Sequence, residues 1–338
     1  MTIINGIEID IGKLKVNETR LAIENNYPLE DKLNVIGVIS NPCNYARRYI
    51  LAREFIQRMN TESNINLYVV ELAYGNQEYY VTEPKNKRHL RLRADVPIWH
   101  KENMINIGIK KLLPPNWRSV AWIDMDVEFE NTSWALDTLK ILNGHRDIVQ
   151  LFSHCIDMDL KCNAMSIFPS FGFQYIKGST FGGTGINMWH PGFAWAMTRK
   201  AYEKIGGLYD YSILGAGDNN MCFSIIGNGL KTLNEATTDD YKQSLMDFQA
   251  KANTLRLGYT PGVIRHFFHG SKKNRKYNER WKILVDNSYS PFLHLKKNAD
   301  GLLVPTVECP QNLLDDILNY FKERNEDEGI PTLNNRYI

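Results

Sequence analysis

Apolar and polar positions follow two repeating patterns in the first half of the chain. Short apolar runs at 34–39, 66–72 and 119–123 have the length of buried strands, and apolar residues recur at helical spacing at 45–59 and 101–113. This order of strand, helix, strand, helix, strand predicts an α/β fold with a mostly parallel, doubly wound sheet. The segment between the second strand and the second helix is polar and basic, and we expect a loop there.

The second half of the chain is less regular. Its apolar runs predict further strands at 148–152 and 193–197 and helices at 199–205, 218–227 and 311–324. The segment 172–192 is rich in glycine and aromatic residues and predicts a long loop, of the kind that often closes over a substrate.

The same pattern divides the chain into three parts. Residues 1–30 begin with a short alternating stretch and predict an N-terminal hairpin or arm. Residues 31–290 hold the alternating strands and helices and are expected to form one domain. Residues 291–338 would form a C-terminal extension that carries an amphipathic helix.

Composition and charge mainly exclude certain classes of partner and location. Forty Lys and Arg against 38 Asp and Glu give a net charge of +2, which is far from the basic balance of a general nucleic-acid binder, so we expect no nucleic-acid partner. No stretch of 18 apolar residues occurs, and the first residues lack a signal-peptide pattern, so no transmembrane segment is expected. The five cysteines show no metal-ligand spacing and fit a reducing compartment.

Two pairs of aspartates carry the same three letters, DMD. Asp124 and Asp126 directly follow the apolar run 119–123, where two carboxylates can serve a divalent cation and a ribose or metal-bound water. Asp157 and Asp159 lie in a polar connection, and we interpret that pair as a solvated turn. The position after a predicted strand therefore selects the first pair.

Two histidines late in the chain suggest further metal ligands. His266 and His269 are three residues apart after a turn, so both imidazoles could reach one metal ion from a single bend. Seven cationic residues nearby could meet a diphosphate: Arg265, Lys272, Lys273, Arg275, Lys276, Arg280 and Lys282. The alternatives are structural core histidines and a solvated basic face; a second basic run at 85–93 is interpreted as solvated surface.

Asp218 is a candidate general base. It follows Gly215 and Gly217 at the start of a predicted helix, and glycines there permit the close approach of a substrate. The alternative is that Asp218 only caps that helix, and the local sequence does not separate the two interpretations.

Several of these residues belong to a longer ordered pattern. The chain carries, in order, WHKENMINIG at 99–108, AWIDMD at 121–126, HPGFAWAM at 190–197, IGGLY at 205–209, GAGD at 215–218 and VIRH at 263–266. In order and spacing these segments, which cover roughly residues 34–285, resemble the motifs of the inverting β-1,4-galactosyltransferase-like family of GT-A glycosyltransferases. The resemblance implies a GT-A fold with a nucleotide-binding half at 31–130 and an acceptor-binding half at 131–290.

The resemblance also implies residue roles. It makes Asp126 and His269 ligands of Mn²⁺ or Mg²⁺, with His266 where the family has a methionine ligand, and it makes Asp218 the base. The remaining expected site residues contact the nucleotide-sugar donor or the glycan acceptor: for the donor Asn41, Pro42, Asn44, Lys101, Asp124, Arg265 and Lys272, and for the acceptor Trp189 and Trp195.

The expected activity is therefore transfer of a sugar from a nucleotide-sugar, a UDP-sugar, to a hydroxyl of a glycan or glycoconjugate with inversion. Lacking the signal anchor of the family's Golgi members, the chain resembles a bacterial or large-virus enzyme, expected in the cytoplasm or, if viral, in the host cytoplasm or virion. Two alternatives are a sugar nucleotidylyltransferase, for which residues 40–44 make a poor phosphate loop, and a catalytically silent carbohydrate-binding GT-A module.

Overall fold

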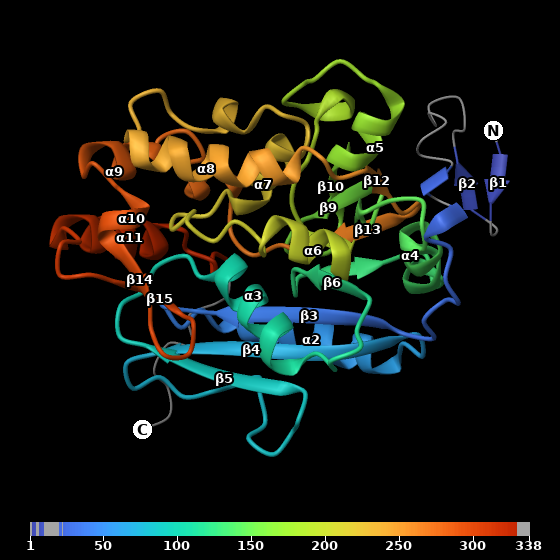
Figure 1. Ribbon diagram of the computed structural model, residues 1–338. Helices are drawn as coiled ribbons and strands as arrows, with labels where there is room; N and C mark the ends of the chain where they lie inside the picture. The colour runs from blue at the N-terminus through green and yellow to red at the C-terminus, as the bar shows by residue number, and fades with distance from the viewer. Residues whose placement is uncertain (1, 5–6, 10–19, 22, 330–338) are drawn as a thin grey trace.

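A mixed sheet of seven strands forms the centre of the molecule (Figure 1). The computed structural model describes residues 2–4, 7–9, 20–21 and 23–329. The strand order is β12 (Leu257–Tyr259), β8 (Ile148–Gln150), β11 (Ala194–Thr198), β6 (Ser119–Ile123), β3 (Leu33–Ser40), β4 (Ile65–Tyr74) and β5 (His89–Ala94). All run in one direction except β11, which lies antiparallel between β8 and β6. The predicted α/β class with a mostly parallel sheet is confirmed.

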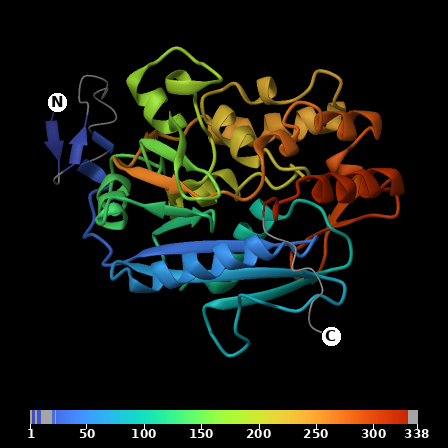
Figure 2. The ribbon, with the colours of Figure 1, turned by 180° about the vertical axis from the view of Figure 1, so that it is seen from behind.

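Helices cover both faces of this sheet (Figures 1 and 2). Helices α2 (Ala46–Thr61) and α4 (Trp134–Leu142) share one hydrophobic core with Val35 and Ile39 of β3. Helices α3 (Lys101–Leu112) and α6 (Arg199–Ile205) share the other core with Ile36. Because the sheet is buried on both faces, its central strands are continuous apolar runs in the sequence.

A second, four-stranded sheet stands beyond the end of β6. Its order is β10 (Ala164–Pro169), β9 (His154–Met158), β13 (Val263–His266) and β7 (Val127–Phe129). Strand β13 pairs antiparallel with β7, so that His266 lies opposite Val127, and it pairs parallel with β9, so that His266 also lies opposite Asp157. These pairings bring three distant segments together at the carboxyl ends of the parallel strands, where ligands bind in open α/β sheets.

Apart from those of the N-terminal arm, the remaining elements all belong to the second half of the chain. They are α5 (Phe171–Lys177), η2 (Gly185–Asn187), α7 (Gly217–Ile225), η3 (Gly229–Thr232), α8 (Asp239–Ala252), η4 (Lys272–Arg275), α9 (Trp281–Asp286), α10 (Pro291–His294), the antiparallel pair β14 (Leu295–Lys297) and β15 (Leu303–Pro305), and α11 (Gln311–Glu323). Helix α8 is absent from the sequence prediction, although Thr238 caps it by accepting a hydrogen bond from the Tyr241 amide.

The loop expected between β4 and α3 contains strand β5, so that prediction is wrong in part. Along β5, Leu92 and Ala94 are buried, while Arg91 and Arg93 stack their guanidinium groups over the ring of Tyr79. This alternation is typical of an edge strand with one polar face. The basic run at 85–93 resembles a solvated loop in composition, so the sequence does not predict a strand there.

The long loop expected at 172–192 is also shorter than predicted. Helix α5 occupies its first part, because the Ser170 side chain caps the helix by accepting from the Phe173 amide and Gly178 ends it at a φ of 67°.

The two ends of the chain are described in part. Strands β1 (Thr2–Ile4) and β2 (Ile7–Ile9) pair antiparallel within the expected N-terminal arm. Some residues of both ends lie outside the described residues. They are residues 1, 5–6, 10–19 and 22 of the expected arm and residues 330–338 of the expected extension. Among the helices that are described, none is both long and apolar enough to cross a membrane.

Candidate functional site

A cavity of about 740 Å³ opens at the carboxyl ends of the parallel strands, between the two sheets and the C-terminal helices. Its wall includes most of the residues expected at the site: Lys101, Asp124, Asp126, Asp218, His266, His269 and Lys272. A second cavity of about 480 Å³ at the opposite ends of the strands contains none of the predicted site residues. The carboxylates and histidines predicted from the sequence to carry the chemistry, together with Lys101 and Lys272, therefore line one cavity.

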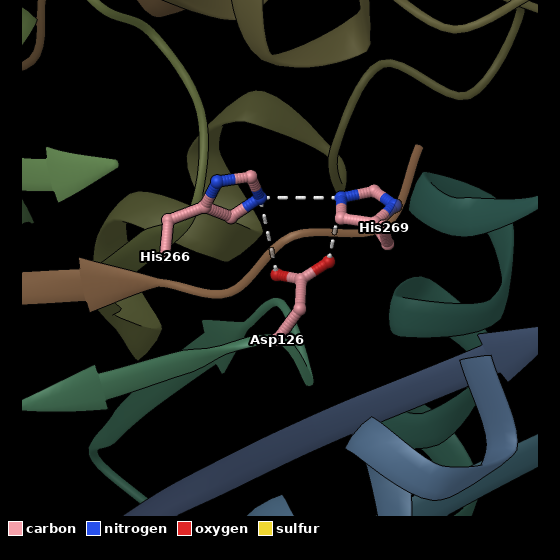
Figure 3. A group of neighbouring side chains, drawn as sticks. All are labelled: Asp126, His266 and His269. Atoms are coloured by element: carbon pink, nitrogen blue, oxygen red, sulfur yellow. Dashed lines mark hydrogen bonds and ion pairs between the residues drawn. The ribbon is translucent and has the colours of Figure 1, made fainter. Parts of the chain in front are cut away.

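Asp126, His266 and His269 form a compact group of potential metal ligands (Figure 3). Their ligand atoms all lie within 4.8 Å of one another. The His269 Nε2 atom is 3.2 Å from Asp126 Oδ2 and 3.2 Å from His266 Nε2, which is 4.0 Å from Asp126 Oδ1. The group is held together by the backbone, because the Phe267 amide donates to the Asp126 carbonyl at 2.8 Å.

The protonation states of this group suit a divalent cation. Burial alone would raise the pKa of Asp126, but the adjacent His269 and His266 lower it, so the carboxylate stays ionised. Burial and the neighbouring Arg275 lower the pKa of His269 to about 4, so its imidazole is neutral at pH 7. Among the described residues, Asp126 Oδ1 has no hydrogen-bond partner although it is buried. One carboxylate and two imidazoles are ligands that Mn²⁺ accepts.

Arg275 occupies part of the space beside this group. Its Nη2 atom lies 2.7 Å from His269 Nε2 and donates to it, so a cation that binds this nitrogen must displace the guanidinium. The donor set fits a metal ion after that side chain moves aside.

The second DMD pair is not the solvated turn that we expected. Asp157 lies on β9 with 2% of its surface exposed; its Oδ1 is 2.7 Å from His266 Nδ1, and its Oδ2 is 2.6 Å from Lys272 Nζ. Burial opposes ionisation, but hydrogen bonds from His266 and Lys272 lower the pKa of Asp157 to about 2. The prediction fails because the long-range pairing of β9 with β13 buries this aspartate, while Asp159 does lie in a turn.

Lys101 joins the other two predicted carboxylates. Its Nζ atom is 2.7 Å from Asp124 Oδ1 and 3.0 Å from Asp218 Oδ2. Burial alone would lower the pKa of Lys101, but Asp124 and Asp218 raise it, so the ammonium group stays charged. Asp218 lies in the first turn of α7, and its carboxylate faces Lys101 and the cavity.

Glu102 is a buried carboxyl group near Asp218 that the sequence analysis missed. A Cβ atom at Gly217 would lie 2.4 Å from the Glu102 carboxyl carbon, so only glycine leaves room for this group beside Asp218. Burial and the charge of Asp218 raise the pKa of Glu102. No motif identifies it, since the contact between α3 and the start of α7 depends on the folded chain.

The predicted nucleoside loop lies beside the cavity wall. The Asn41 side chain is buried and bonds the Tyr45 backbone at 3.0 and 2.8 Å, and Asn44 adopts a φ of 55°. Asn41 and Pro42 line a separate small pocket with Arg48, which also lines the main cavity. Their contact with a nucleoside stays a prediction.

Three other predicted residues do not line the cavity. Arg265 is exposed and forms an ion pair with Glu130. Trp189 packs edge-on against Phe171. Trp195 is fully buried in β11 and donates to the Pro191 carbonyl at 2.8 Å, which leaves no ring face for an acceptor, so the prediction for Trp195 is corrected.

Residues from the C-terminal part complete the wall on the other side. Arg275, Arg280, Trp281 and Arg324 line the cavity, and Arg324 stacks over the ring of Trp99 at 5.2 Å. Clustered cations in the sequence indicated the first two, but no sequence signal indicated Arg324.

Solved structures, rather than sequence families, show similarity to this chain. No protein-family model matches the chain, and no curated protein matches its sequence. Among solved structures, it is similar to the crystal structure of S. aureus TarS 1-349, at 12% identity and a TM-score of 0.36, over 88% of this chain and 72% of that one. It is also similar to the apo-form glycosyltransferase GlyE of Streptococcus pneumoniae TIGR4, at 13% identity and a TM-score of 0.30, over 88% of this chain and 64% of that one.

Proposed function

We propose that this protein is a metal-dependent glycosyltransferase of the GT-A type. It would transfer a sugar from a UDP-sugar to a hydroxyl group of a glycan or glycoconjugate, with inversion at the anomeric carbon. The observation that carries the proposal is that the ligand atoms of Asp126, His266 and His269 lie within 4.8 Å of one another in one cavity. The same cavity is lined by Lys101, which forms ion pairs with Asp124 and Asp218.

The charges along the cavity wall support an anionic donor. Lys272, Arg275 and Arg280 line the same cavity as the three potential metal ligands, so cationic groups surround the place where a diphosphate would meet the metal. A bound Mn²⁺ or Mg²⁺ would supply positive charge that stabilises the leaving diphosphate. Asp124, which lines the same cavity two residues before Asp126, would contact the ribose.

Asp218 would act as the general base. As the acceptor oxygen attacks the anomeric carbon, the bond from that carbon to the diphosphate oxygen breaks, and its electron pair leaves with the diphosphate. Asp218 takes the proton of the attacking hydroxyl group. Lys101, whose Nζ atom lies 3.0 Å from Asp218 Oδ2, would orient this carboxylate before the reaction. A single displacement of this kind inverts the configuration of the sugar.

Titration calorimetry of UDP with Mn²⁺ tests the proposal. Wild-type protein should bind UDP in the presence of Mn²⁺ and lose most of this binding in EDTA. Asp126→Ala should abolish the metal-dependent part, whereas Glu128→Ala, which changes an acid two residues further on and outside the cavity wall, should retain it.

Product analysis separates the proposal from its alternatives. Incubation with UDP-sugars, Mn²⁺ and a panel of glycans should release UDP. Release of pyrophosphate from UTP and a sugar phosphate would indicate a nucleotidylyltransferase, and glycan binding without any product would indicate a silent module. Unchanged binding of UDP and Mn²⁺ by Asp126→Ala would refute the ligand assignment.

A further inference from the structure

Asp157 lies directly behind one of the potential metal ligands. In the parallel pairing of β9 with β13 it is the cross-strand neighbour of His266, and its Oδ1 atom is 2.7 Å from His266 Nδ1. It does not line the cavity, and the proposed reaction does not use it. A buried carboxylate is costly unless it is paired, and both oxygens of Asp157 are paired, one with His266 and one with Lys272.

The contact determines which nitrogen of His266 carries the proton. A carboxylate only accepts hydrogen bonds, so the Nδ1 atom that faces it must be the donor. In a neutral imidazole the other nitrogen, Nε2, then carries the lone pair. The Nε2 atom of His266 is the one that faces Asp126 and His269, at 4.0 and 3.2 Å (Figure 3).

Lys272 holds the carboxylate in place from its other side. Its Nζ atom lies 2.6 Å from Asp157 Oδ2, so the two oxygens of Asp157 have separate partners. The carboxylate group of Asp157 therefore cannot rotate freely. Lys272 also lines the cavity, so it links Asp157 to the region proposed for the diphosphate.

We propose that Asp157 is a positioning residue, which fixes the orientation and the tautomer of His266 so that its Nε2 lone pair is presented to the metal ion. The inference rests on the proposed function in one respect, because it concerns the same cation site. Carboxylates that accept from the far nitrogen of a ligating histidine are common, and their loss typically weakens metal binding about 10- to 100-fold.

The test compares Asp157→Asn with Asp159→Asn. The amide introduced by Asp157→Asn can turn its NH₂ group toward Nδ1 and move the imidazole proton to Nε2, where it blocks the metal. Asp159 belongs to the same DMD motif, but its carboxylate accepts hydrogen bonds from the backbone amides of Lys161 and Asn163 in its own turn. Calorimetry with Mn²⁺ alone should show binding that is about 10- to 100-fold weaker for Asp157→Asn and unchanged for Asp159→Asn.

A second measurement needs neither metal nor activity. Nitrogen NMR of the imidazoles in the metal-free wild-type protein should show His266 protonated at Nδ1, and Asp157→Asn should shift this population toward Nε2. This readout stands even if Asp157→Asn folds poorly, because the wild-type spectrum alone can contradict the inference.

The outcomes separate the inference from the proposed function. Wild-type protein that binds no Mn²⁺ but has His266 protonated at Nδ1 would overturn the metal-dependent function and retain the tautomer control. Wild-type protein with His266 protonated at Nε2 and not at Nδ1, or Asp157→Asn that binds Mn²⁺ as tightly as wild type, would overturn the role of Asp157.

Discussion

Lys101 illustrates how much of the site depends on single side chains. One ammonium group lies within 3.0 Å of both Asp124 and Asp218, and Glu102 adds a third carboxyl group nearby. The single positive charge of Lys101 cannot balance three carboxylates at once. Burial accordingly raises the pKa of Glu102 and of Asp124, although the positive charge of Lys101 opposes the rise at both groups.

The role of Asp218 as a base leads to a kinetic prediction. Asp218→Asn keeps the size of the side chain but removes its ability to take a proton, so turnover should fall by about two to four powers of ten. Binding of UDP with Mn²⁺ should be retained, as measured by calorimetry.

A matched control is Asp239→Asn, which removes an exposed acid from the first turn of α8, as Asp218→Asn does from α7. This variant should keep wild-type turnover. If Asp218→Asn turns over as fast as wild type, another group must accept the proton.

The two DMD motifs show what sequence can and cannot predict about a site. The sequence selects Asp126 because a predicted strand precedes it, and local sequence carries that information. It assigns Asp157 to a solvated turn because the surrounding connection is polar. The contact of Asp157 with His266 spans 109 residues and depends on the register of β9 against β13. A register formed by residues so far apart leaves no local pattern, and the same holds for Glu102 against Gly217.

At the scale of elements, α2 begins without a capping side chain of its own. Its N-cap residue, Tyr45, makes no side-chain capping bond. The Asp327 carboxylate, beyond α11, accepts instead from the Ala46 and Arg47 amides at 2.9 Å each. The negative charge also interacts favourably with the N-terminal end of the helix dipole.

Removing this distant cap should destabilise the protein. Asp327→Ala leaves two amides at the start of α2 without their acceptor, so the free energy of unfolding should fall by about 0.5–2 kcal/mol, as for other lost caps. Urea unfolding measures the change. Asp286→Ala, an exposed acid whose cation partner is 4.0 Å away, should change it by less than about 0.5 kcal/mol. Equal effects of the two variants would show that the cap contributes nothing.

Elements were predictable where their periodicity is local. The helix expected at 199–205 has those bounds in α6, with a Thr198 cap and a left-handed Gly206 at its end. Strand β5 was missed because Arg91 and Arg93 gave it the composition of a loop. The four-stranded sheet was missed as a unit, because its strands come from segments that are separated by loops and helices.

At the scale of the whole molecule, the C-terminal extension packs against the sheet through polar as well as apolar contacts. His100, just before α3, has its Nε2 atom 2.9 Å from the Leu303 carbonyl of β15 and its Nδ1 atom 3.1 Å from the Tyr74 hydroxyl. Asn103 adds bonds to Gly301 and Leu303. Burial lowers the pKa of His100 to about 4, so its neutral form is the one that fits this junction.

This junction gives the protein a pH-dependent contribution to stability. Between pH 6.5, the ordinary pKa of histidine, and pH 4, the unfolded chain binds a proton at His100 that the folded chain does not. Lowering the pH through this window therefore destabilises wild type relative to His100→Gln, by up to ~1.4 kcal/mol per pH unit. Urea unfolding of both proteins at pH 7.5 and pH 5 measures the difference. A difference independent of pH would mean that His100 titrates normally in the folded state.

The distance between α2 and its cap has a consequence for synthesis. Asp327 is the 281st residue that the ribosome adds after Ala46, and Tyr45 likewise accepts its hydrogen bond from the Asn325 amide only late in synthesis. Early folding of the nascent chain therefore proceeds with the first turn of α2 uncapped. Arg48 in the same helix obtains its partner Glu326 at the same late moment, so one wall of the cavity is finished only when translation has passed α11.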